Sequence, residues 1–199
     1  MLAAEAKEVD ELLGGDLSAF LETEAFEAKA GQAASFPVFG KAFKRLVVVG
    51  LGDKELDART AGAAAAGAVK SLKGGSVGLT SADGLEPQDP GRGARGTWRQ
   101  ALLEGLLLGL HADKRFQGSK TPEKEKAPKG PEQLELLAWG SEGAMDQAKA
   151  MAAGVVFARE LVNAPANIVD PLSLTAAAVD MAQRLGLTAK VMDEKAGGA

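Results

Sequence analysis

Short runs of apolar residues alternate with apolar stripes at helical spacing along the chain. The clearest run is Leu46–Val49, which lies between Lys44-Arg45 and Gly50. A continuous β-branched run with such boundaries is typical of a strand buried on both faces. Pro37 cannot donate to a ladder, so the extended segment around it is expected at a sheet edge. The runs predict strands over residues 36–39, 46–49, 76–80, 134–139 and 187–192.

Helical stripes fill the intervals between these runs. A helix is expected over residues 3–13, and Asp16 is the expected N-cap of a second short helix. Ser141 is expected to cap a long helix, and Asp170-Pro171 supplies an N-cap and first-turn proline for the last one. The strand and helix alternation predicts an α/β layered domain with a mostly parallel sheet. The four helices that follow these first two are predicted over residues 57–72, 97–111, 141–162 and 171–185.

Composition excludes several kinds of chemistry. The chain of 199 residues has no cysteine, which excludes disulfides, thiolate catalysis and cysteine-based metal sites. His111 is the only histidine, so a site with several histidine ligands cannot form. The formal charge of −4 argues against a dedicated nucleic-acid binder. No apolar run is long enough to span a membrane and no leader is visible, so the sequence predicts a cytoplasmic protein.

Gly50-Leu51-Gly52 follows the clearest strand and admits two interpretations. In the first, the glycines let the backbone approach a phosphate at the next helix. However, Glu55 occupies the third glycine position of the dinucleotide fingerprint, and no Gly-Lys-Ser/Thr follows. A tight strand-to-helix turn is therefore favoured over a nucleotide loop.

Other charged or polar positions have structural interpretations. His111 ends an apolar helix, where a cap or surface role is favoured. The basic clusters Arg92–Arg95 and Lys120–Lys129 are expected to be solvated loops. Asp193 and Glu194 would point to opposite faces of a strand and cannot form an acid–base pair. No residue is assigned a catalytic, cofactor-binding or metal-binding role.

Four segments in order resemble the leucyl aminopeptidase (cytosol aminopeptidase) family. Phe26–Gly31 is similar to a Phe-x-Gly-Lys-x-Gly segment, and Leu46–Asp53 to the family's first long strand and turn. Glu104–Leu110 resembles the family's Glu-Gly-x-x-Leu-Gly helix, and the Asp113 and Phe116 that follow resemble its aromatic-rich exit. The sharpest match is Ala158–Asn167 followed by Asp170-Pro171. The resemblance covers about residues 20 to 195.

This resemblance implies a fold, an activity and separate roles for two domains. It implies a three-layer macro-domain-like N-terminal domain over residues 1–140 and a long linker helix over 141–164. Residues 165–199 would begin an α/β peptidase domain that is incomplete here. In the family that domain binds two divalent metals, zinc, manganese or magnesium, and releases N-terminal amino acids from peptides. The family motif that carries several metal ligands is absent from this sequence, so the chain alone is expected to be inactive.

Three functions remain open from the sequence. The first is the N-terminal portion of an aminopeptidase, which shapes access to the active site and supports a homo-hexamer. The second is a macro-like module that binds a nucleotide or ADP-ribose near Gly50–Asp53. The third is a non-catalytic paralogue that acts as an interaction subunit. Asp53 and Asp57 would repel phosphates, which disfavours the second.

We expect residues 165–199 to be less stable in this chain than residues 36–140. Leu174, Ala178, Met181 and Leu185 form an apolar stripe that one helix and one strand cannot bury by themselves. Amide hydrogen exchange should therefore be faster across 165–199. Equal protection of the two regions would contradict this expectation.

Overall fold

The computed structural model describes residues 4–29, 31–50, 58–72, 75–80, 98–113, 115–116, 132–137 and 142–192. The chain divides into two compact units, Met1–Val155 and Val156–Ala199. Helix α5 (Glu142–Val162) begins in the first unit and ends in the second. Within the described residues no helix is both long and apolar enough to cross a membrane.

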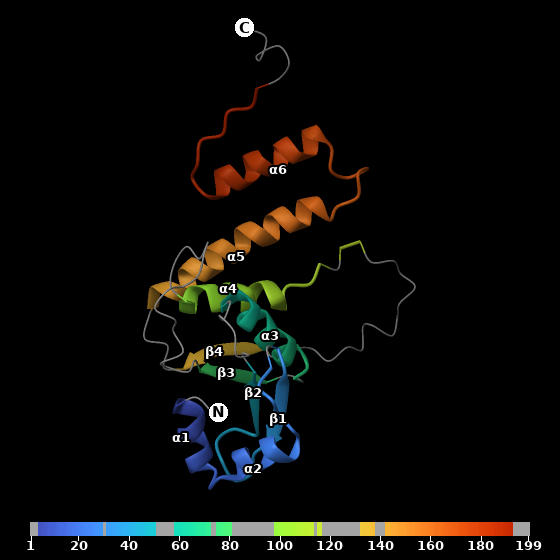
Figure 1. The fold of residues 1–199 in the computed structure, drawn as a ribbon. Coiled ribbons are helices and arrows are strands. Elements are labelled where there is room, and N and C mark those ends of the chain that lie inside the picture. The colour runs from blue at the N-terminus through green and yellow to red at the C-terminus, as the bar shows by residue number, and fades with distance from the viewer. Residues whose placement is uncertain are drawn as a thin grey trace. The chain divides into compact units, whose positions relative to one another are not determined.

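The strands of the first unit form two pairs (Figure 1). β1 (Ala33–Pro37) and β2 (Arg45–Val49) are antiparallel, with Ala33 opposite Val49. β3 (Ser76–Thr80) and β4 (Gln133–Leu137) are parallel, with Ser76 opposite Gln133. The predicted α/β class is confirmed, although only the second pair has the predicted parallel direction. The connection from β1 to β2 is short, and a short connection can join only antiparallel neighbours.

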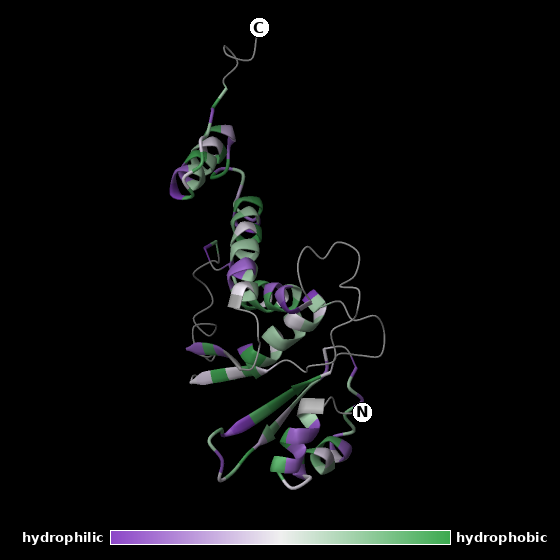
Figure 2. Cartoon of the chain, turned by 90° about the vertical axis from the view of Figure 1, so that its left-hand side faces the viewer, coloured by the Kyte–Doolittle hydropathy of each residue, from purple (hydrophilic) through white to green (hydrophobic). Residues whose placement is uncertain are grey.

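β2 shows how a two-stranded pair changes the expected burial. Figure 2 shows β2 as a mostly hydrophobic ribbon. Its apolar residues Leu46–Val49 are nevertheless only half-buried, and Arg45 is exposed. The prediction that this strand is buried on both faces is therefore wrong. Among the described residues, β1 is the only strand paired with β2.

The first two helices form a hairpin in which the predicted cap is wrong. α1 (Ala4–Leu12) and α2 (Asp16–Thr23) are joined by Gly14 and Gly15, both with positive φ. Gly15, not Asp16, is the N-cap of α2, and Asp16 is its first residue. The Asp10 carboxylate of α1 accepts from the Ser18 amide at 3.0 Å and also from the Ser18 hydroxyl. These hydrogen bonds lower the pKa of Asp10 and supply the capping oxygen from the preceding helix.

Helices α3 (Ala58–Lys70) and α4 (Trp98–Leu110) cross at the centre of the core (Figure 1). Their backbones approach so closely that a Cβ on Gly62 would lie 2.0 Å from the Leu102 carbonyl oxygen. A Cβ on Gly105 would lie 2.1 Å from the Arg59 carbonyl oxygen. Two helices can pack at this separation only where one side has no side chain. The core cluster contains Ala58, Ala61, Ala65, Ala66, Trp98, Ala101, Leu102, Leu103, Leu106, Ala144 and Ala148.

The second unit is less buried. α6 (Pro171–Arg184) has Ala182 as its one buried residue. Leu172, Leu185, Leu187 and Met192 are exposed. The strand predicted over residues 187–192 does not form, since these residues have no regular structure and no described strand lies beside them. A lone extended segment has no ladder to stabilise it.

The start of α6 confirms the predicted Asp170-Pro171 cap. The Asp170 carboxylate accepts from the Ser173 amide at 2.7 Å, and the Asp170 amide donates to the Ser173 hydroxyl at 2.8 Å. Together these bonds form a reciprocal capping box. The bond from the Ser173 amide holds the pKa of Asp170 below its usual value.

Replacing Gly62 with alanine should destabilise the first unit by about 3 kcal/mol, because the new methyl group would overlap the Leu102 backbone. Gly67→Ala is the matched control on the same helix. No atom lies within 4 Å of a Cβ at Gly67, so the better helix propensity of alanine should stabilise by about 0.8 kcal/mol. Denaturant unfolding of both variants measures the difference. Equal effects of the two substitutions would contradict the close α3–α4 approach.

Asp170→Ala should increase amide exchange in α6 at neutral pH, because it removes the capping acceptor. Asp170→Asn should retain the cap, since an asparagine oxygen accepts the same bond. The lowered pKa belongs to the folded state, so the contribution of the carboxylate is present at neutral pH. It is lost as the pH falls through that lowered pKa. The native chain should therefore lose more α6 protection on acidification than Asp170→Asn, and identical pH profiles would refute the assignment.

Candidate functional site

Gly50 follows the last residue of β2 and hydrogen-bonds to the segment before β1. Its amide donates to the Gln32 carbonyl at 2.7 Å, and its carbonyl accepts from the Gly31 amide at 3.0 Å. A Cβ on Gly50 would lie 2.4 Å from the Lys29 carbonyl oxygen, so no side chain fits there. The Gly50 amide is thus occupied by the chain itself and is not available to a phosphate. Leu51–Asp53, Glu55 and Asp57, the rest of the nucleotide hypothesis, lie outside the described residues.

The segment after α2 contains two alanines with positive φ, Ala25 at 48° and Ala28 at 54°. At Ala25 the chain ends α2 in a Schellman arrangement: the Phe26 amide donates to Leu21, and the Ala25 amide to Glu22. Ala28 occupies the position at which the resembling family segment has glycine. A left-handed conformation costs an alanine about 1 kcal/mol relative to glycine. The glycine of that segment is therefore explained by backbone conformation.

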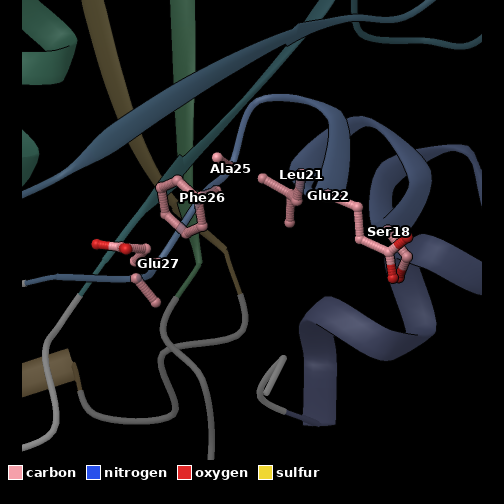
Figure 3. A pocket seen from close by; sticks show the side chains of 7 residues that line it. Ser18, Leu21, Glu22, Ala25, Phe26 and Glu27 are labelled. Carbon is pink, nitrogen blue, oxygen red and sulfur yellow. The ribbon is translucent and has the colours of Figure 1, made fainter.

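An open hollow of about 440 Å³ lies between α2 and this segment. Figure 3 shows Leu21 and Phe26 between the side chains of Glu22 and Glu27. Leu21 is buried, Phe26 is half-buried and both glutamates are exposed. The Glu27 carboxylate forms an ion pair with Lys29. We call this feature the acidic hollow; it is lined by Ser18, Leu21, Glu22, Ala25, Phe26, Glu27 and Ala28. Sequence reasoning did not find it, because its walls come from a helix end and a loop without a chemical motif.

Glu104 lies at the α3–α4 contact and is only 3% exposed. One carboxylate oxygen, Oε2, accepts from Arg59 Nε at 2.9 Å and from a second Arg59 nitrogen at 2.6 Å. The other oxygen, Oε1, accepts from the side-chain Nε2 of Gln100 at 3.0 Å. Both oxygens are satisfied, which is the condition for burying a carboxylate at tolerable cost. The Glu-Gly pair of this helix therefore joins two helices: Glu104 by charge and Gly105 by close approach.

The residues after α4 make local interactions. The His111 amide donates to the Leu107 carbonyl at 3.2 Å and completes the last turn. Its ring Nε2 is buried without a hydrogen-bond partner in the described part of the chain. The Arg115 side chain donates to both Asp113 oxygens, at 2.9 and 2.8 Å, and lowers the pKa of Asp113 to about 2. The Arg115 guanidinium also lies 5.2 Å from the centre of the Phe116 ring. These contacts stabilise a helix exit, and no group of three or more metal-ligating side chains includes His111 in the described part of the chain.

The segment with the sharpest family resemblance, Ala158–Asn167, forms the end of α5 and the turn before α6. The Asn163 amide continues the α5 ladder to Arg159 at 2.8 Å. The Pro165 carbonyl then accepts from the amides of Ile168 and Val169, which forms the turn before α6. Pro165 thus marks the reversal between the two helices.

No group of three or more metal-ligating side chains occurs in the described ranges. The donor set needed for the divalent metals that the resemblance implies is therefore not assembled by these residues. The basic clusters Arg92–Arg95 and Lys120–Lys129, and the pair Asp193 and Glu194, lie outside them. What the described residues assemble is a packed helical contact, two strand pairs and one open hollow.

The chain matches a family model and several curated proteins. The family model "Cytosol aminopeptidase family, N-terminal domain" matches residues 1–120. A probable cytosol aminopeptidase of Microcystis aeruginosa is 34% identical over 196 residues, which cover 98% of this chain and 38% of the relative. One from Gloeothece citriformis is 35% identical over 201 residues, with 98% and 39% covered. The chain spans little more than a third of these curated relatives.

Solved structures agree in fold. A mutant of tomato leucine aminopeptidase matches with a TM-score of 0.69 and 31% identity, over 92% of this chain and 35% of that chain. The bottromycin maturation enzyme BotP, in a complex with Mn, matches with a TM-score of 0.60 over 84% of this chain and 34% of that one. At 22% identity the second match shows the fold alone. The match over residues 1–120 and the shared fold show that this chain belongs to the cytosol aminopeptidase family.

Proposed function

We propose that this chain acts as the N-terminal portion of a leucyl aminopeptidase-like metallo-exopeptidase that releases N-terminal amino acids from peptides. The observation that carries the proposal is the asymmetric coverage, 98% of this chain against 38% of its Microcystis relative. On this proposal, the chemistry belongs to the part of the relatives that this chain does not match.

The proposed role of this portion is assembly and the shaping of access to the active site. Residues 1–140 form the N-terminal domain, 141–164 the linking helix, and 165–199 the beginning of the peptidase domain. The exposed apolar residues around α6, such as Leu172 and Leu187, support this division, because they would be buried by further peptidase-domain chain. The proposed partners are a peptidase domain and further subunits of a homo-hexamer, with zinc, manganese or magnesium held in the peptidase domain. The proposed location is the cytoplasm, which the names of the relatives support.

A domain-replacement experiment tests this role. The 199-residue chain replaces the matching region of the Microcystis relative, and hydrolysis of leucinamide is measured with added Mn²⁺. The control is the same relative with that region deleted. We expect no turnover by the 199-residue chain alone, and at least a tenfold higher rate from the hybrid than from the deletion.

Two results would contradict the proposal. Hydrolysis by the highly purified chain alone would place catalytic groups within it. A hybrid no more active than the deletion control would remove the assembly and access role. The intact mass of the native protein adds an independent measurement, since a mass of 20.4 kDa would favour the interaction-subunit alternative.

A further inference from the structure

The connection between β1 and β2, residues 38–44, is a closed turn that we call the hairpin tip. The Val38 amide donates to the Lys44 carbonyl at 3.0 Å, and Gly40 turns the chain at a φ of 71°. Within this turn Phe39 is 85% exposed and Phe43 is 43% exposed. Two exposed rings in so short a turn form an apolar patch that the fold itself does not cover.

The charge around the tip has one sign. Residues 28–50 contain no acidic side chain, and Lys41, Lys44 and Arg45 lie in the tip or next to it. All three are exposed, and neither lysine forms an ion pair among the described residues. Arg45 Nη1 donates to the neutral Ser35 hydroxyl at 2.9 Å, which leaves its charge uncompensated. The tip therefore combines a projecting aromatic ring with three cations.

Helix α2, which has acidic but no basic residues, lies on one face of the hairpin. Phe36 and Leu46 are directly opposite each other and share that face, where the Phe36 ring centre is 5.1 Å from that of Phe20 on α2. Pro37 and Arg45 are the next opposite pair, so their side chains lie on the other face. Figure 2 shows the turn of the hairpin at the lower left, with α1 and α2 to its right. The Arg45 cation is thus separated from the acidic helix by the hairpin itself.

We propose that the hairpin tip binds the surface of a membrane that contains anionic phospholipids. Phe39 enters the boundary between headgroups and acyl chains, and the three cations lie at the level of the lipid phosphates. An apolar ring beside Lys and Arg side chains suits this boundary, because each part meets the layer that it prefers. The inference concerns the N-terminal portion alone and does not depend on the proposed peptidase activity.

The small size of the tip favours a lipid surface over a protein or a nucleic acid. A stable protein interface buries about 800 Å² on each partner, which takes roughly 20 residues, whereas the tip spans only residues 38–44. A lipid surface needs no complementary pocket, because its molecules rearrange around an inserted side chain. A single strand of nucleic acid binds along a groove, and one turn provides none.

The formal charge of −4 does not prevent this contact. Charge interactions are screened over about 8 Å at physiological salt, so the groups nearest the lipid dominate. At the tip these groups are Lys41, Lys44 and Arg45, with no acidic side chain between residues 28 and 50. The local sign of charge is therefore the one that an anionic surface attracts.

Co-sedimentation of the 199-residue chain with lipid vesicles tests the proposal. Vesicles made of equal parts of phosphatidylcholine and phosphatidylserine are compared with vesicles of phosphatidylcholine alone. We expect at least tenfold tighter binding to the anionic vesicles. Most of this difference should disappear at about 0.5 M salt, because the charges are then screened. Equal binding to both kinds of vesicle, or no binding to either, would overturn the proposal.

Charge reversal assigns the binding to the tip. Lys41→Glu/Lys44→Glu should weaken binding to the anionic vesicles at least tenfold, because it makes the contact repulsive. The matched control, Lys149→Glu/Lys190→Glu, makes the same charge change at exposed positions outside the hairpin and should retain native binding. Equal losses in the two variants would show that binding follows the overall charge and would refute the role of the tip.

A second pair of variants tests the aromatic ring. Phe39→Ser retains every charge and should weaken vesicle binding at least fivefold, because it removes the inserted apolar group. Leu12→Ser is the matched control on α1, where Leu12 is 71% exposed, and should leave binding unchanged. Equal effects of the two substitutions would contradict insertion of the ring.

Two further measurements separate insertion from other contacts. Lipids brominated on their acyl chains should quench the fluorescence of the Phe39→Trp variant more than that of the native chain. Equal quenching would place position 39 outside the membrane and refute the proposal. Binding to a single-stranded oligonucleotide that Lys41→Glu/Lys44→Glu abolishes, with vesicle binding unchanged, would assign the tip to nucleic acid instead.

Discussion

The close contact between α3 and α4 is the constraint on which the first unit depends. Gly62 and Gly105 allow each helix to touch the backbone of the other, and the small residues around them continue the contact. This separation leaves little room for water, so Glu104 is buried and must be paired. Arg59 from the other helix and Gln100 from the same helix satisfy it. Removing one member would leave a buried charge unpaired, which costs more than the pair contributes.

The family-like segments have structural roles among the described residues. Phe26–Gly31 folds against Gly50, where a carbonyl occupies the space of a side chain. Glu104 and Gly105 join two helices, and Pro165 and Asp170 form the turn and cap before α6. Each segment meets a local geometric requirement of backbone conformation, close approach or capping. Motifs of this kind identify a fold more securely than a reaction.

The sequence predicted most elements because their signals are local. The apolar runs at 46–49 and 76–80, the alanine-rich helix and the Asp170-Pro171 cap all appear where expected, within a few residues. The predictions that are wrong concern features that depend on residues outside the element itself. Asp16 did not cap α2 because Asp10, on the preceding helix, supplied the oxygen. Residues 187–192 did not form a strand because a strand needs a partner, which spacing along the chain cannot reveal.

The contacts that join different helices and segments also could not be predicted from individual residues. Arg59, the partner of Glu104, lies 45 positions before it in the sequence and could not be inferred from spacing. The acidic hollow likewise contains no motif, because its walls come from the end of α2 and the segment after it, and only the fold brings these side chains together.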